Sequence, residues 1–276
     1  MEIRAIVMDL DGTALRPDRV SFSPRLDEAL LEAHRQGVAI VPATGRQYSL
    51  LPPPLLADPV WSGIVVLCNG AEIRRLAGGE LLDSRYMTAA HLAPLVQAAK
   101  ELGIAIELSS GGQLYLTADS WEVSRRREAL RFHLGVLGRV GHQVECLEAF
   151  LADTDLAFEK VNLPYLPPEA REEILSVLSE LPLCGVFSGP DSMEVTHREA
   201  TKAQGMRTAC RLLGIDIAHT MAIGDSGNDI PMLQAAGLGV AMGDAPEEVR
   251  RAAWAVTGSN PDDGAAQAIE RYVLGR

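Results

Sequence analysis

Short apolar runs alternate with stretches whose apolar residues recur at helical spacing, first near the beginning of the chain and again near its end. The first apolar run is Ile3–Met8, and a helical pattern over Pro24–Gln36 separates it from the runs Val38–Pro42 and Ile64–Cys68. Such alternation predicts a parallel sheet wrapped by helices, a Rossmann-like α/β fold. Ligands are then expected at the carboxyl ends of the strands.

The last part of the chain repeats this alternation. The expected elements are helix Ala200–Leu213, strand Thr220–Ile223, helix Ile230–Ala236, strand Gly239–Ala241, a helix opening at Asp244-Ala245-Pro246, and a final run Ala253–Val256. We therefore predict one core domain that is formed by residues 1–84 together with residues 188–276.

The middle of the chain has a different order of elements. Helix Thr88–Leu102 precedes the apolar runs Ile104–Leu108 and Gln113–Thr117, which the turn Ser109–Gly112 joins into a predicted hairpin. A similar order returns in strand Leu156–Leu163, helix Pro168–Glu180, and strands Leu183–Phe187 and Ser192–Thr196. The pattern predicts an antiparallel sheet with helices on one face. We expect residues 85–187 to form a separate α+β cap domain that acts as a lid.

Composition narrows the possible partners. The 276 residues are 47% hydrophobic, so the chain can bury a substantial core. Its net charge of −12 argues against a nucleic acid or an anionic membrane as partner, because both would repel it. A small phosphorylated molecule remains possible if its charge is met locally. An arginine-rich helical stretch around Glu122–Arg131 is better explained as a solvated helix face than as a binding site.

Cysteines and histidines give no sign of a zinc site. The four cysteines, Cys68, Cys146, Cys184 and Cys210, lack paired ligand spacing, and we expect reduced core residues. The six histidines are scattered and match no metalloprotease pattern. No apolar run approaches the roughly 20 residues that span a bilayer, so we expect a cytoplasmic protein. The sequence does not indicate the oligomeric state.

Asp9 and Asp11 form the most informative pair of polar residues, at the end of the first apolar run. If the strand continues through Asp9, both carboxylates point to the same side of its end. Two such groups can divide the work of a nucleophile and of a general acid and base. Gly12 allows a sharp turn, and Thr13 offers a hydroxyl and an N–H to an anion. A plain Asp-Gly turn or a fragment of a calcium loop is the alternative, although the other oxygen ligands of an EF-hand are missing.

Other apolar runs end in polar loops of similar character. Thr44-Gly45-Arg46 is a candidate phosphate cradle, or else an ordinary strand-to-helix turn with a threonine cap. Gly224–Asp229 contains two aspartates and an asparagine, where a surface Asx-turn is the simpler explanation. Lys202 opens a helix and could supply positive charge, or could be an exposed lysine at a helix start.

In its order of motifs the chain resembles the haloacid dehalogenase superfamily of phosphotransferases. Asp9-Leu10-Asp11-Gly12-Thr13 is similar to the nucleophile motif, Thr44-Gly45-Arg46 to the second, Lys202 to the third and Gly224–Asp229 to the fourth. The long insert between the second and third motifs resembles that of the Cof-type sugar-phosphate phosphatases, which carry a large α/β cap. Two lesser similarities are Cys68-Asn69-Gly70-Ala71 and Asn260-Pro261-Asp262-Asp263-Gly264-Ala265.

The resemblance implies a magnesium-dependent phosphomonoesterase. Asp9 would be the nucleophile, and Asp11 the general acid and base. Mg²⁺ would be held by the carboxylates of Asp9 and Asp225 and the backbone carbonyl of Asp11, with Asp229 supporting directly or through water. The phosphoryl oxygens would be held by the Leu10 and Gly45 backbone amides, the Thr44 hydroxyl, Lys202 and Asn228.

Two other functions remain open at this stage. A phosphosugar mutase would use the same nucleophile but return the phosphoryl group to the sugar. A non-catalytic sugar-phosphate sensor would keep the pocket without turnover. The sequence names no substrate, and Arg46 could either reach that substrate or brace its own loop.

Overall fold

The computed structural model describes residues 2–127 and 131–276. It divides into two compact units, which we call the core unit and the insert unit. The core unit comprises Met1–Ser84 and Thr201–Arg276, and the insert unit comprises Arg85–Ala200.

A parallel sheet forms the centre of the core unit. Its strand order is β14-β13-β12-β1-β2, and each neighbouring pair runs parallel. The strands are β1 (Ala5–Met8), β2 (Ala39–Pro42), β12 (Thr220–Gly224), β13 (Leu238–Ala241) and β14 (Ala255–Val256). Strand β1 lies between β12 and β2, so Asp9 emerges at the carboxyl edge of the sheet with a neighbouring strand on each side. This architecture confirms the predicted Rossmann-like α/β core.

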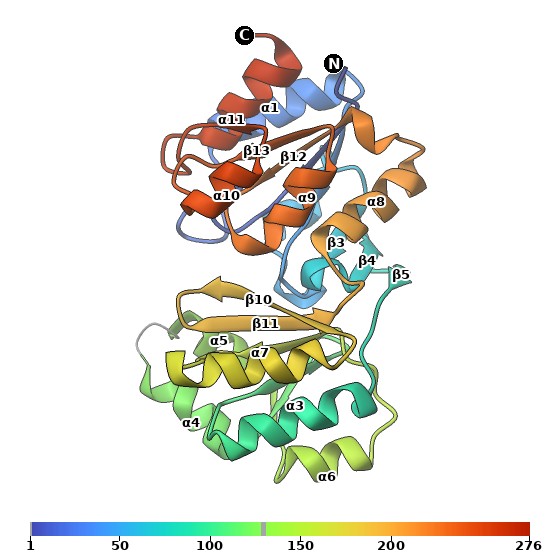
Figure 1. Cartoon of the computed structure of the whole chain (residues 1–276). Coiled ribbons are helices and arrows are strands. Elements are labelled where there is room, and N and C mark those ends of the chain that lie inside the picture. Colours follow the sequence, from blue (N-terminus) through green and yellow to red (C-terminus); the bar gives the residue numbers. More distant parts are fainter. Residues whose placement is uncertain (1, 128–130) are drawn as a thin grey trace. The chain divides into compact units, whose positions relative to one another are not determined.

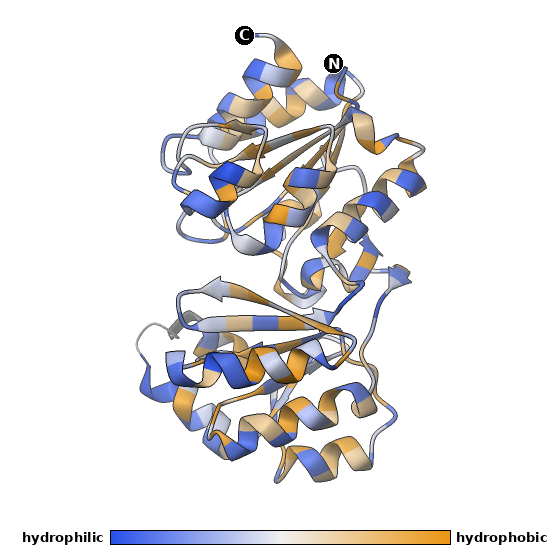
Figure 2. Ribbon diagram, in the orientation of Figure 1, coloured by the Kyte–Doolittle hydropathy of each residue, from blue (hydrophilic) through white to orange (hydrophobic). Residues whose placement is uncertain are grey.

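Helices cover both faces of this sheet. In Figure 1, α1 and α11 lie together on one face, and α8, α9 and α10 lie on the other. Their bounds are α1 (Pro24–Arg35), α8 (Lys202–Leu213), α9 (Ile230–Ala235), α10 (Glu247–Ala252) and α11 (Gly264–Ile269). Strands β1, β2, β12 and β13 are apolar and largely buried between these layers (Figure 2). A sheet covered on both faces requires continuous apolar strands, which explains why the sequence shows runs rather than alternation.

A second, smaller sheet in the core unit differs from the expectation. The run Ile64–Cys68 was expected as a further strand of the parallel core, but it belongs to an antiparallel sheet of order β3-β4-β5. A single parallel bridge, Ala43 to Val66, links this sheet to the chain just after β2. The three strands are β3 (Ile64–Leu67), β4 (Glu72–Arg75) and β5 (Leu81–Ser84), and a short helix α2 (Pro53–Ala57) precedes them. Because β4 has one apolar residue among three charged ones, it gave no hydrophobic signal.

The insert unit is built on a six-stranded sheet of order β10-β11-β9-β6-β7-β8. Its elements are α3 (Ala89–Glu101), β6 (Glu107–Ser110), β7 (Gln113–Leu116), α4 (Ala118–Arg126), α5 (Arg131–Val140), β8 (Gly141–Gln143), α6 (Leu147–Ala152), β9 (Lys160–Leu163), α7 (Arg171–Ser179), β10 (Leu183–Gly189) and β11 (Ser192–His197). The pairs are antiparallel as expected except β7 with β8, which is parallel. That strand was not predicted, since it has three residues and no apolar pattern.

The two faces of the insert sheet differ in chemistry. On one face, helices α3, α6 and α7 share a buried apolar cluster with the strands. On β6 and β9 the alternate positions carry polar side chains, including Glu107, Lys160 and Asn162. The buried Glu107 carboxylate accepts a hydrogen bond from Asn162 Nδ2 at 3.1 Å and lies 2.7 Å from His133 Nε2. The second face is therefore lined by polar side chains that hydrogen-bond one another, several of them buried.

The second boundary of the insert lies later than the expected residue 188. Ser188 falls inside β10, which pairs with β11, so both strands belong to the insert unit and the division falls at Ala200 and Thr201. The first boundary, at Ser84 and Arg85, is where it was expected. A hairpin that completes a sheet cannot be divided between units, which is the physical reason for the difference.

Some other expectations concern single groups. Helix α4 ends at Arg126, and residues 128–130 of the arginine-rich stretch lie outside the described part of the chain. Arg125 and Arg126 are exposed and both pair with Glu122, in agreement with a solvated helix face.

Cys68 and Cys210 are buried as expected, whereas Cys146 and Cys184 are only half-buried. Among the described residues, no helix has both the length and the apolar character needed to cross a bilayer.

Candidate active site

Strand β1 ends at Met8, one residue before the first aspartate. The Asp9 N–H donates to Ile223 O at 3.0 Å, and the chain then turns away from the sheet. The premise that the strand continues through Asp9 is therefore not met. The carboxylates of Asp9 and Asp11 take different partners, Lys202 and Arg46. Two side chains that are close in sequence are thus held by separate parts of the site.

Gly12 makes the turn after Asp11 possible. Its φ is +84°, in the left-handed region that favours glycine. A Cβ at this position would lie 2.5 Å from Asp225 Oδ2, so a side chain would collide with that carboxylate. The next residue, Thr13, donates its hydroxyl to Asp225 Oδ1 at 2.8 Å. The turn after the first strand therefore holds Asp225 by close contact and by a hydrogen bond.

Lys202 provides the positive charge at the centre of the site. It is the first residue of α8, whose N-terminus is capped by the Thr201 hydroxyl. Its side chain is 1% exposed, and Nζ donates to Asp9 Oδ1 at 2.5 Å and to Asp229 Oδ1 at 2.7 Å. Burial alone would lower the Lys202 pKa, but the Asp229 and Asp9 carboxylates raise it above its ordinary value. The lysine therefore stays charged.

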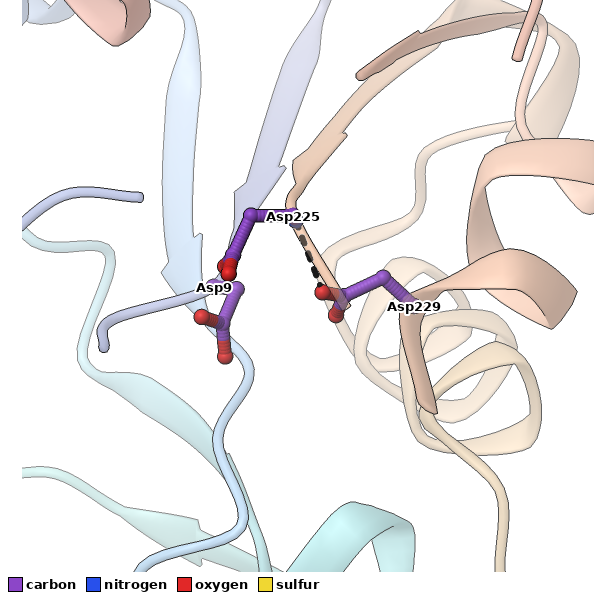
Figure 3. Close-up of side chains that lie close together, drawn as sticks. All are labelled: Asp9, Asp225 and Asp229. Atoms are coloured by element: carbon purple, nitrogen blue, oxygen red, sulfur yellow. Dashed lines mark hydrogen bonds between the residues drawn. The ribbon is translucent and has the colours of Figure 1, made fainter. Parts of the chain in front are cut away.

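Three aspartates converge beside this lysine. Asp9, Asp225 and Asp229 offer carboxylate oxygens that lie within 4.8 Å of one another (Figure 3). Burial raises the pKa of Asp9 well above its ordinary value; Lys202 opposes the shift, and Asp229 and Asp225 add to it. Burial and the nearby Asp229 raise the pKa of Asp225 to about 6. Three carboxylates with one lysine leave excess negative charge in a dry place, which favours a bound cation.

Asp229 already uses both of its oxygens within the protein. Oδ1 accepts from Lys202, and Oδ2 accepts from the N–H groups of Asp225 and Ser226 at 3.0 and 2.9 Å. The dashed line in Figure 3 marks its bond to Asp225. Both Asp229 oxygens are thus hydrogen-bonded within the protein, and Oδ2 holds the loop that carries Asp225. The residues that fit a divalent cation best are Asp9 and Asp225, since carboxylate oxygens are the ligands that Mg²⁺ prefers.

The loop after β2 supplies oriented hydrogen-bonding groups. Thr44 is buried, its N–H donates to Val66 O, and its hydroxyl oxygen accepts from the Arg46 N–H at 3.1 Å. Because the Thr44 oxygen accepts this bond, its O–H remains able to donate to an anion. Gly45 lies between these residues, and Leu10 lies beside Asp9 with a buried side chain.

Asn69 joins two of these loops, a role that the sequence analysis did not assign. It adopts a left-handed conformation with φ +57°, and its N–H donates to Thr44 O at 3.0 Å. Its side-chain oxygen accepts from Asn228 Nδ2 at 3.0 Å. A Cβ on the following Gly70 would lie 2.2 Å from Thr201 O, so this turn packs tightly against the start of α8. The Asn-Gly pair after a core strand was the available signal.

The structure therefore brings most of the predicted site residues together at one edge of the parallel sheet, as expected for an open α/β fold. The predicted residues that contact or lie close to one another are Asp9, Thr44, Lys202, Asp225, Asn228 and Asp229, and Asn69 joins them. Asp11 pairs with Arg46 instead of joining the three other aspartates.

Comparison with known proteins identifies this arrangement. The model of the haloacid dehalogenase-like hydrolases matches residues 6–269, almost the whole chain. The chain belongs to this family. The match confirms the resemblance and the expected class of enzyme, a phosphatase-type hydrolase of the haloacid dehalogenase (HAD) superfamily.

The relatives of this HAD-like hydrolase extend over its full length. A phosphoglycolate phosphatase of Methanobrevibacter smithii is 33% identical, with 99% of this chain and all of the relative covered. The 5-amino-6-(5-phospho-D-ribitylamino)uracil phosphatase YcsE of Bacillus subtilis is 28% identical over 99% of this chain and 97% of its own. Among solved structures, BT1666 of Bacteroides thetaiotaomicron, a phosphatase of the superfamily, superposes with a TM-score of 0.80 at 28% identity, covering 98% of this chain and 95% of that one.

Proposed function

We propose that this enzyme is a magnesium-dependent phosphatase that hydrolyses small phosphorylated metabolites through an aspartyl-phosphate on Asp9. The observation that carries the proposal is the buried Asp9 carboxylate, held by the Lys202 ammonium at the carboxyl edge of the parallel sheet and close to Asp225. A nucleophile needs a fixed orientation and a neighbouring cation that offsets charge as the phosphoryl group arrives.

Two displacements account for the reaction. In the first, an Asp9 carboxylate oxygen attacks phosphorus, and the ester oxygen leaves with a proton from Asp11. In the second, water attacks the same phosphorus while Asp11 takes a proton, which frees inorganic phosphate and restores Asp9. Lys202 keeps Asp9 in place through both displacements, because its ammonium also bonds Asp229 and cannot swing away without leaving a buried carboxylate unpaired.

The acidic cluster suits a divalent cation. Asp9 and Asp225 would hold Mg²⁺ with the backbone carbonyl of Asp11, and Asp229 would support them by fixing the loop that carries Asp225. When bound, the metal supplies positive charge that offsets the negative phosphoryl oxygens.

The remaining contacts to the phosphoryl group come from groups already oriented in the site. We assign them to the Leu10 and Gly45 N–H groups, the Thr44 hydroxyl, Lys202 and the Asn228 amide. The Asn228 oxygen accepts from the Ser226 hydroxyl at 2.7 Å, and one of its amide hydrogens goes to Asn69. This fixes the amide orientation, so the second N–H has a defined direction.

We assign substrate selection to the insert unit and favour sugar phosphates as the substrate class. The polar face of its sheet carries carboxylate, amide and ammonium groups, which suit hydroxyl-bearing substrates. A relative named for a phosphorylated ribityl compound supports a hydroxylated phosphate ester, and one named for phosphoglycolate supports a small one.

Phosphate release from a panel of phosphorylated sugars, nucleotides and cofactors, with Mg²⁺ and with a chelator, tests the proposal. We expect Mg²⁺-dependent release that is abolished in Asp9→Asn and preserved in Asp18→Asn, a control on the exposed loop after the site. Conversion of one sugar phosphate to its isomer without free phosphate would instead indicate a mutase. Binding without any turnover would indicate a sensor.

A further inference from the structure

The side chain of Arg46 is tied to the backbone at two points. Nη1 donates to Leu50 O at 3.0 Å, and Nη2 donates to Arg19 O at 2.9 Å. Its backbone N–H bonds the Thr44 hydroxyl oxygen, so both ends of the residue are held. The Arg46 side chain is 13% exposed. A planar group that is fixed in this way is ready to orient a carboxylate before any ligand is present.

The same guanidinium donates two parallel hydrogen bonds to the Asp11 carboxylate. Nε donates to Asp11 Oδ2 and Nη2 donates to Asp11 Oδ1, each at 2.7 Å. Within residues 2–127 and 131–276, Arg46 is the one side chain that bonds this carboxylate. Asp11 itself lies on the turn before Gly12, 34% exposed, where the chain has left the strand. Arg46 therefore determines where the Asp11 side chain lies.

We propose that Arg46 is a positioning residue for the reaction, which sets the orientation of Asp11. This inference rests on the proposed function, in which Asp11 gives a proton to the leaving oxygen. While both Asp11 oxygens accept from one guanidinium, the carboxyl plane is fixed against Arg46, although each oxygen keeps a further lone-pair site. Opening one of the two bonds when a substrate is bound would free that oxygen to turn toward the leaving oxygen.

The structure indicates which group moves. Arg46 stays in place because two backbone carbonyls hold it, whereas Asp11 needs only a rotation of its own side chain. After that rotation Asp11 keeps one oxygen on Arg46 and turns the other toward the leaving group. Arg46 thus acts as a pivot, and it affects turnover through Asp11 and not through contact with the substrate.

A double-mutant cycle tests this role directly. The variants are Arg46→Ala, Asp11→Asn and the two combined, assayed with Mg²⁺ on an alkyl phosphate, whose poor leaving group needs a proton. We expect Arg46→Ala to lower kcat by about 10²-fold, the lower end for loss of general acid catalysis, with KM nearly unchanged. In the Asp11→Asn background the same change should alter kcat by less than about twofold, because the group that Arg46 positions is absent.

Two further variants complete the design. Arg46→Lys should recover little of the lost kcat, since an ammonium cannot make the two parallel bonds. Arg25→Ala removes another arginine that makes a paired contact, with Glu270 on the surface of the same unit, and should leave kcat unchanged. An aryl phosphate with a good leaving group should be affected less than the alkyl phosphate by Arg46→Ala.

The opposing results are distinct. An equal fall of kcat in both backgrounds, or a loss confined to KM, would overturn the proposal and place Arg46 on the substrate. If the wild type released no phosphate from any ester, the proposed function would fail on its own. The contact between Arg46 and Asp11 would then be tested by thermal unfolding of the same four proteins without metal. Non-additive losses in Tm would support the positioning role of Arg46, and additive losses would reject it.

Discussion

Lys202 Nζ lies 2.5 Å from Asp9 Oδ1, although the two residues are 193 positions apart in the chain. Both side chains are nearly inaccessible, with 1% and 6% exposed. The contact joins the two halves of the core unit that flank the insert. A buried pair of this kind contributes little net stability when intact but is costly to break, because the remaining charge has no water around it.

Lys202→Met should therefore destabilise the protein as well as inactivate it. Removing the ammonium leaves Asp9 and Asp229 buried beside each other, and we expect the free energy of unfolding to fall by about 3 kcal/mol. Chemical denaturation without metal measures this change. Lys100→Met, which breaks an exposed pair with Glu148, is the matched control and should leave the denaturation midpoint nearly unchanged. Equal effects of the two variants would contradict the electrostatic role of Lys202.

Mg²⁺ should stabilise the folded enzyme by relieving repulsion among the carboxylates. With Mg²⁺ in excess over its dissociation constant, on the order of 100-fold, the gain would be about 2.7 kcal/mol. We expect a higher Tm with Mg²⁺ than with a chelator, and no such rise in Asp225→Asn. If Mg²⁺ left the Tm unchanged while activity still required it, the metal would bind only together with the substrate.

The raised pKa of Asp225 predicts a particular pH dependence in the metal-free protein. Its folded value of about 6 lies above the ordinary value, so between these values the folded state binds more protons than the unfolded state. The contribution of Asp225 to stability is therefore greatest at acidic pH and is lost as pH rises toward 6. Asp225→Asn should gain stability relative to the wild type at pH 7 and lose that advantage at about pH 4. A stability advantage of Asp225→Asn that did not depend on pH would contradict the raised pKa of Asp225.

Gly12→Ala should damage the acidic site specifically. Gly12 and Gly37 have almost the same backbone angle, φ +84° and +83°, but a Cβ at Gly12 would meet Asp225 whereas one at Gly37 would meet nothing within 4 Å. Both alanine variants should lose about 1 kcal/mol through backbone strain. Only Gly12→Ala should weaken Mg²⁺ binding, measured by calorimetry or by the Mg²⁺ dependence of turnover. Similar Mg²⁺ affinities in both variants would show that the close approach is unimportant.

Sequence reasoning succeeded where a local pattern has one structural outcome. Apolar runs such as Ala39–Pro42 and Thr220–Gly224 had to be buried strands, and polar loops after parallel strands had to meet at one edge. The resemblance to HAD phosphotransferases, which the family match confirms, rested on such loops in order.

What the sequence could not supply were contacts between distant segments. Whether Asp11 shares a side with Asp9 depends on where β1 stops, and the turn at Gly12 ends it one residue early. Likewise, the use of both Asp229 oxygens depends on the fold of a five-residue loop around them, and the link from Asn69 to Asn228 joins residues 159 positions apart. The boundary near residue 188 failed for the same reason, since a hairpin belongs to the sheet that it completes.

The uninterrupted course of the insert from Arg85 to Ala200 has a consequence for how such enzymes diversify. Every residue to which we assign a role in phosphoryl transfer lies before or after that stretch, so exchange of one contiguous segment would replace the insert unit, to which we assign substrate selection, and leave those residues in place. The exchange would succeed only if the incoming segment ended before Thr201, whose hydroxyl caps the helix that presents Lys202. Under this assignment, substrate preference and phosphoryl-transfer chemistry can change separately in evolution, and Thr201 lies at the boundary between the two segments.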